Sequence, residues 1–336
     1  MKKLLIIGLA TVTAIWLLVL PGLVGGYLRG QVPEWIEAWP EAETTQFTPG
    51  WFRSQLDWAS DDGVNIDLQA RHLPALKPGL IRLRGQVGSP MTTSPIRLDG
   101  QVGLTGGWHL QLDAEALSAE ATGGLHGRAL GLNLAQAPGQ PLTAIFQADS
   151  LGHDSSSADL PGLEDVRILA RSQNGPDGEL VLGLDLNLVA ETLGPARLTL
   201  NAAPVPADAL SELMDGLAQL AGSSADSFAE SMALLTVAGA WQQMAAAGMV
   251  IRLENLSLGS STALSGNWPA GHNQPRLDGT GQTSELMAWY RTLAYRLGGR
   301  APELAELEAR AWLDTLVDAG WLRLDGNTFR VQAPGH

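Results

Sequence analysis

The chain has 336 residues, of which 45% are hydrophobic and 17% charged, which excludes a disordered protein and allows one large domain or two ordinary ones. With 21 basic and 35 acidic residues the formal net charge is −14, so we expect repulsion from nucleic acid and from anionic lipid headgroups. Because the chain has no cysteine, disulfides, thiolate metal sites and a cysteine-linked lipid anchor are excluded.

The first element is an uncharged stretch, residues 4–28, which directly follows Lys2 and Lys3. A helix needs roughly 20 apolar residues to cross the hydrocarbon core of a bilayer. Basic residues before such a helix favour a cytoplasmic N-terminus. The stretch therefore predicts a single transmembrane anchor, residues 1–28, with the rest of the chain on the other side of the membrane.

The alternative for the same stretch is a cleaved signal peptide. Its apolar core is usually about 7–15 residues long and is followed by small residues at the cleavage site. Here 17 residues, 4–20, precede the break at Pro21, and Val24-Gly25-Gly26 is a poor cleavage site. We favour the uncleaved anchor, and both alternatives place the body on the same side of the membrane.

Residues 29–45 form a juxtamembrane segment that contains a short amphipathic piece. Trp35, Ile36 and Trp39 would share one side of a helical turn. They would lie either among the lipid headgroups, where tryptophan is favoured, or against the folded domain.

Residues 46–205 are β-rich, because apolar and polar residues alternate with a period of two. The expected strands are 52–58, 64–70, 81–84, 96–99, 108–114, 130–134, 143–147, 166–170, 180–188 and 196–200. Since the connections are short, the sheet should be an antiparallel meander. A polar loop is expected at 149–161, where the spacing of Asp149, Asp154 and Asp159 does not match a calcium-binding loop.

One eight-residue pattern occurs twice in this region. Residues 81–88 read Ile-Arg-Leu-Arg-Gly-Gln-Val-Gly, and residues 96–103 differ from them only by Asp99. We interpret the two copies as ordinary strands running into turns. A repeated strand-turn unit is the alternative.

Residues 206–336 are helix-rich and should complete the same domain. Helices are expected at 208–220, 225–247, 285–297 and 303–319, with strands at 250–258 and within 262–282 and a closing hairpin at 321–332. In the second helix, the expected apolar contacts are Met232, Leu235, Val237, Trp241 and Met244. The fold class is therefore α+β: an N-terminal transmembrane helix, then a large, mainly antiparallel, curved sheet with helices packed on it, closed by a helix and a hairpin.

No motif in the sequence indicates catalysis. The six histidines show no metal-ligand spacing, and there is no nucleophile elbow, phosphate-binding loop or dinucleotide fingerprint. We predict no catalytic residue, no metal and no cofactor, and a protein that is not an enzyme. An uncharacterised hydrolase stays open, because catalytic triads assemble in space and not in sequence.

The clearest one-sided strand supplies the candidate site. Five leucines alternate with other residues and share one face: Leu180, Leu182, Leu184, Leu186 and Leu188. They would form an apolar groove for lipid or lipid-like chains if the face were open. We expect helices to cover most of this face.

Two short motifs resemble the YdgA-like family, also known as domain-of-unknown-function family 945. The first contains Gly50, Trp51, Phe52 and Ser54, and the second runs from the closing helix through Gly320 to the hairpin turn at Gly326. The resemblance implies a bacterial inner-membrane anchor with a periplasmic body, and no known reaction. More distantly, the strand-rich pattern is similar to AsmA-type envelope proteins, which are associated with lipid handling.

These observations predict a single-pass inner-membrane protein with a cytoplasmic N-terminus and a periplasmic body. Residues 4–28 would contact the membrane, and an apolar sheet face would bind lipid in envelope maintenance. The alternative is a scaffold for other envelope proteins.

Overall fold

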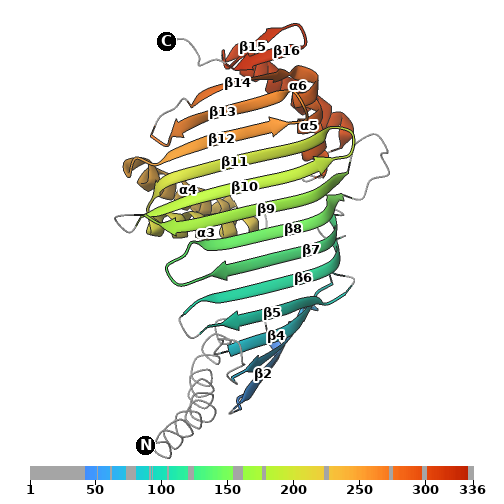
Figure 1. The fold of residues 1–336 in the computed structure, drawn as a ribbon, viewed down its shortest axis with the longest axis vertical. Helices are drawn as coiled ribbons and strands as arrows, with labels where there is room; N and C mark the ends of the chain where they lie inside the picture. The colour runs from blue at the N-terminus through green and yellow to red at the C-terminus, as the bar shows by residue number, and fades with distance from the viewer. Residues whose placement is uncertain are drawn as a thin grey trace, which may run out of the picture. The chain divides into compact units, whose positions relative to one another are not determined.

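The structure is a computed structural model (Figure 1). It describes residues 42–50, 52–60, 63–72, 81–90, 92, 94–103, 106–119, 125–153, 162–175, 179–222, 227–271, 275–296 and 301–331. The anchor predicted at residues 4–28 lies outside these residues. Among the described helices, none is long and apolar enough to span a bilayer.

The described residues form sixteen strands in one sheet, in the order β1 to β14 along the chain and then β16 and β15. The strands whose register is resolved pair antiparallel with their neighbours. This order confirms the antiparallel meander and the sheet-dominated α+β class expected from the short connections.

The chain divides into two compact units, with the boundary inside one strand, β8 (Leu142–His153). Unit 1 comprises residues 1–140 and 144–149, and unit 2 comprises residues 141–143 and 150–336.

Unit 1 is built from strands in the part that the structure describes. They are β1 (Ala42–Thr48), β2 (Arg53–Ser60), β3 (Asn65–Arg71), β4 (Ile81–Gly88), β5 (Ile96–Val102), β6 (Trp108–Ala119) and β7 (Leu125–Gln136), together with the middle of β8. No described helix belongs to this unit. Polar and apolar side chains alternate along the strands, as expected for a sheet with two different faces.

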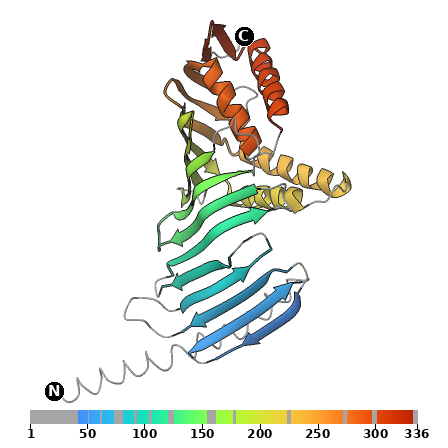
Figure 2. The same ribbon diagram turned by 90° about the vertical axis from the view of Figure 1, so that its right-hand side faces the viewer.

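Unit 2 combines strands with two pairs of helices. The strands are β9 (Leu163–Asn174), β10 (Leu180–Ala190), β11 (Gly194–Val205), β12 (Val250–Leu258), β13 (Thr262–Pro269), β14 (Arg276–Gln282), β15 (Leu322–Asp325) and β16 (Thr328–Val331). The helices are α3 (Ala207–Gly222), α4 (Ser227–Ala246), α5 (Thr283–Arg296) and α6 (Pro302–Asp318). All four helices lie on the same side of these strands (Figure 2).

The first helix pair packs on the sheet through a small hydrophobic core. Its buried members are Val205, Ala209, Met244, Met249 and Ala270. The prediction for α4 is confirmed at Met244 and Trp241, which lie in or against this core. It is wrong at Met232 and Leu235, which are exposed. Helix α4 carries apolar residues on all sides, but α3 and the sheet contact only one side. Apolar residues on its other sides therefore stay exposed.

The second helix pair covers the other end of unit 2. Leu286 and Trp289 of α5 are buried, as are Ala305, Ala309 and Leu313 of α6. Tyr290 and Trp312 stack with ring centroids 5.3 Å apart, which joins the two helices. The closing hairpin adds Phe329, which is only 2% exposed.

The polar loop expected from Asp149 onward begins later than predicted. Strand β8 continues through Asp149 to His153, because Ala148 is buried while Asp149 points to solvent. Such alternation is typical of a strand with one wet face. Asp154 and Asp159 lie outside the described residues.

Candidate functional site

Large apolar side chains of unit 1 line up on one face of its strands. In the register of the sheet, Leu98 lies opposite Leu112, and Leu112 lies opposite Leu132. Residues at facing positions share a face, so the pattern extends from strand to strand. The apolar face of unit 1 consists of Leu56, Trp58, Ile66, Leu68, Leu83, Val87, Ile96, Leu98, Val102, Trp108, Leu110, Leu112, Leu130, Leu132 and Leu134.

None of these side chains is fully buried. All are partly exposed, and the only buried hydrophobic residues described in unit 1 are two small ones, Ala70 and Ala148. Neighbours on adjacent strands shield each side chain laterally, and no described helix of the unit packs on top of them. In its described part, unit 1 therefore has a one-sided apolar layer in place of a closed core.

The repeated pattern seen in the sequence shapes this face. Strands β4 and β5 carry the two copies and pair so that Leu83 faces Gly100 and Gly85 faces Leu98. A Cβ at Gly100 would lie 3.2 Å from Leu110 Cδ1 and 3.3 Å from Leu83 Cβ. The glycines thus leave the space that leucines on neighbouring strands occupy.

The five leucines predicted as a groove lie in unit 2, on β10. Leu180 and Leu182 pack against the core beneath α3 and α4, and Leu188 is buried. Leu184 and Leu186 stay partly exposed, opposite Leu200 and Leu198 of β11. The structure thus packs both ends of this leucine row against other residues, and only Leu188 is fully buried.

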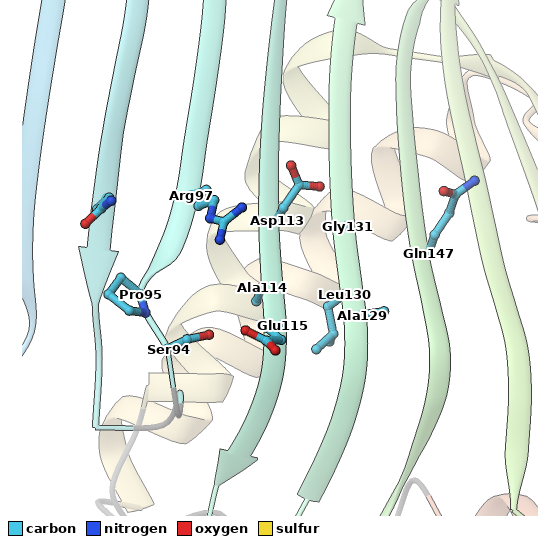
Figure 3. A pocket seen from close by; sticks show the side chains of 11 residues that line it. Ser94, Pro95, Arg97, Asp113, Ala114, Glu115, Ala129, Leu130, Gly131 and Gln147 are labelled. Carbon is cyan, nitrogen blue, oxygen red and sulfur yellow. The ribbon is translucent and has the colours of Figure 1, made fainter.

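The opposite face of unit 1 is polar and holds a cavity of about 670 Å³ (Figure 3). Its polar lining comes from β4, β5, β6 and β8 and from the segment before β5, and consists of Gln86, Ser94, Arg97, Asp113, Glu115 and Gln147. Asp113 accepts a hydrogen bond of 2.9 Å from Gln111 Nε2. Among the described residues no cluster of three histidines or carboxylates could hold a metal ion.

The motif residues from the sequence form local turns in the structure. Ser54 is 2% exposed, and its Oγ accepts a hydrogen bond of 3.4 Å from the Gly50 backbone N–H. Gly320, after α6, has φ +76°, and Gly326 in the hairpin turn has φ +60°, both in the left-handed region that favours glycine. Trp51 lies outside the described residues, and Phe52 is 39% exposed.

Comparisons of the chain with protein-family models, curated proteins and solved structures found no match. The family resemblance of the two motifs therefore stays a prediction.

The sequence predicts a candidate groove at the five leucines of β10 and helices over most of that face, and a ligand in this groove stays a prediction. These five leucines form the strongest alternating run, whereas the less regular strands of unit 1 carry an apolar layer that no described helix of the unit covers. One feature of the sequence does indicate the open face of unit 1: every helix predicted in the body follows residue 205. A long series of alternating strands without nearby helices indicates an apolar face that lacks a cover from its own neighbours in sequence.

Proposed function

We propose that this protein is a membrane-tethered, non-enzymatic envelope protein whose apolar face in unit 1 binds the acyl chains of lipids. Residues 4–28 would anchor it in the bacterial inner membrane, with the body in the periplasm. The observation that carries the proposal is the row of large, partly exposed apolar side chains on β2 to β7, with no described helix of unit 1 above them.

The energetics favour a chain-like apolar ligand over a compact one. Burial of one CH₂ group contributes about 0.8 kcal/mol, so several groups must be covered to reach useful affinity. The apolar face offers side chains on successive strands spaced about 4.8 Å apart, which a flexible chain can cover one after another. Compact polar ligands would gain nothing from this surface.

Site-specific photo-crosslinking tests the proposal. A photoreactive residue placed at Leu112 in the full-length protein should give lipid adducts detectable by mass spectrometry. The matched control is Gln111, its neighbour in β6, which points to the polar face. Equal adduct yields at the two positions, or none at Leu112, would contradict the proposal.

A second candidate function, a scaffold for other envelope proteins, is favoured by apolar residues exposed on the helices of unit 2. Leu304 and Leu307 of α6 are 44% and 64% exposed, and Leu234 and Leu235 of α4 are 52% and 65% exposed. Contiguous exposed apolar residues are typical of protein interfaces. A crosslinker at Leu307 in cells should then yield a discrete protein adduct that is absent with the crosslinker at Asp314.

A further inference from the structure

Three arginines form a continuous row across the polar face of unit 1. Arg53 of β2 lies directly opposite Arg71 of β3, and Arg71 lies directly opposite Arg82 of β4. All three are exposed. Arg84 lies two residues after Arg82 in β4, on the same face of the sheet, opposite Gln69 of β3.

Few acidic groups balance this row. Asp99 Oδ2 accepts hydrogen bonds from both Arg82 (3.1 Å) and Arg84 (3.2 Å), so one carboxylate serves two guanidinium groups. Within the part of the chain that the structure describes, Arg53 and Arg71 form no ion pair. Among the described residues, the four arginines therefore form ion pairs with a single carboxylate, that of Asp99, in a protein whose net charge is −14.

Residues of like charge lie opposite each other on β2 and β3. Asp57 lies opposite Asp67 toward the other end of β2 and β3, about four residues from the arginine row. Like charges at directly opposite positions destabilise a sheet. If Arg71 and Asp67 exchanged positions in β3, each would lie opposite a residue of the opposite charge in β2. The row of arginines therefore destabilises the fold, and a bound anion would relieve this cost.

Phosphate fits the row in both geometry and charge. The guanidinium group presents its donors in a planar fork that matches phosphate oxygens. Adjacent strands are about 4.8 Å apart, so neighbouring arginines can contact the same phosphate group from two sides. Carboxylate ligands carry less charge for the same contact.

A free phosphate ion would be held weakly here. Exposed ion pairs are screened by water and salt, so each contributes little binding free energy. A phosphate that is linked to acyl chains on the same sheet has a much higher effective concentration at the row. This difference favours a lipid headgroup over free phosphate as the occupant.

The row lies where a lipid headgroup could reach it from the apolar face. Arg53 is the first residue of β2, Arg71 is the last of β3, and Arg82 is the second of β4. Long arginine side chains at strand ends can extend past the rim of a sheet. Ala70 and Leu83, next to Arg71 and Arg82, point to the apolar face.

We propose that Arg53, Arg71 and Arg82 bind the phosphate headgroup of a lipid whose acyl chains lie on the apolar face of unit 1. This inference rests on the proposed function and names the class of lipid, one with an anionic phosphate. It also limits the repulsion from anionic lipid headgroups that we expect from the net charge, because this repulsion need not apply at the arginine row. Screening limits the repulsion of distant carboxylates to about 8–10 Å, so the local row determines what binds there.

Competition between two lipids with identical chains tests the inference. The full-length protein with the photoreactive residue at Leu112 is solubilised in a neutral sugar-based detergent with equal amounts of phosphatidylglycerol and diacylglycerol. We expect roughly threefold to tenfold more phosphatidylglycerol adduct, from two or three exposed ion pairs. The double variant Arg53→Gln, Arg71→Gln should bring the ratio close to one while the total adduct yield persists.

Matched controls separate charge from position. The double variant Arg97→Gln, Arg128→Gln removes the same charge from exposed sites in unit 1 outside the row and should keep the ratio of the original protein. Arg53→Lys with Arg71→Lys keeps the charge but loses the fork, and should give an intermediate ratio. An unchanged ratio in the Arg53, Arg71 glutamine variant, or an equal loss in the Arg97, Arg128 control, would overturn the inference.

The two proposals fail in different ways. If the original protein gives no adduct with either lipid, the proposed function itself is wrong, and the headgroup inference falls with it. If both lipids give equal adducts with the original protein, the apolar face still binds acyl chains, and only the phosphate inference is wrong.

Discussion

The Thr262 hydroxyl donates a hydrogen bond of 2.6 Å to Oε2 of Glu285. The Ser261 hydroxyl donates to the same oxygen at 2.8 Å, and the Ser260 backbone N–H donates to Oε1 at 3.1 Å. Glu285 lies in the first turn of α5, whereas Ser260 and Ser261 lie in the turn after β12 and Thr262 is the first residue of β13. The Glu285 carboxylate therefore links α5 to the sheet of unit 2 through three hydrogen bonds.

This cluster predicts a pH-dependent contribution to the stability of unit 2. Partial burial alone would raise the pKa of Glu285, but the hydrogen bonds from Thr262, Ser261 and Ser260 outweigh it and lower the pKa below its ordinary value of 4.5. The contribution should therefore be full above about pH 4.5 and be lost as the pH falls through the lowered value. Glu285→Gln should reduce the free energy of unfolding by about 1 kcal/mol at pH 7 and by progressively less in acid, as measured by urea titration.

Glu303→Gln is the matched control for this measurement. Glu303 also lies in the first turn of a helix, α6, so both substitutions remove the same interaction with the helix dipole. We expect Glu303→Gln to have a smaller effect at pH 7. Equal losses for the two variants would show that the hydrogen bonds to Glu285 do not stabilise the fold.

Described helices cover the sheet in unit 2 but not in unit 1, which predicts unequal costs for removing a leucine. Leu188 in unit 2 is 4% exposed, so Leu188→Ala should leave a cavity and cost about 2–5 kcal/mol. Leu112 on the apolar face of unit 1 is partly exposed, so Leu112→Ala should cost roughly half as much or less. Urea unfolding of both variants measures this difference, and similar costs would mean that Leu112 lies in a closed core.

Two glycines of unit 2 should respond oppositely to replacement by alanine. A Cβ at Gly281 would lie 2.8 Å from the ring of Phe329 and closer still to the Thr262 hydroxyl, so Gly281→Ala should destabilise by about 1–3 kcal/mol. Gly239 lies within α4, and a Cβ added there would meet nothing within 4 Å, so Gly239→Ala should stabilise by up to about 1 kcal/mol. Thermal unfolding of the two variants should show melting temperatures that shift in opposite directions.

Local patterns in the sequence predict the elements well, but not which faces are covered. The alternation in β10 and the helical spacing of Leu286 and Trp289 follow from a single segment of chain, so strand, helix and buried side could be predicted. The exposure of Leu235 could not, because α4 is apolar on every side and only tertiary contacts select the buried one. The arginine row could not be predicted either, because Arg53, Arg71 and Arg82 are far apart in sequence and become neighbours only through strand register.

Tryptophan fluorescence offers a test of lipid contact that leaves the apolar layer nearly intact. Trp108 lies on the apolar face of unit 1 and is partly exposed, whereas Trp289 in unit 2 is 1% exposed. Lipids with brominated acyl chains quench only tryptophans that they contact, so they should quench Trp108 and leave Trp289 unaffected. Trp108→Phe keeps an aromatic side chain in place and should remove a measurable part of the quenching, while Trp289→Phe should not. Equal quenching of both variants would place the acyl chains away from the apolar face, and the proposed function would then be wrong.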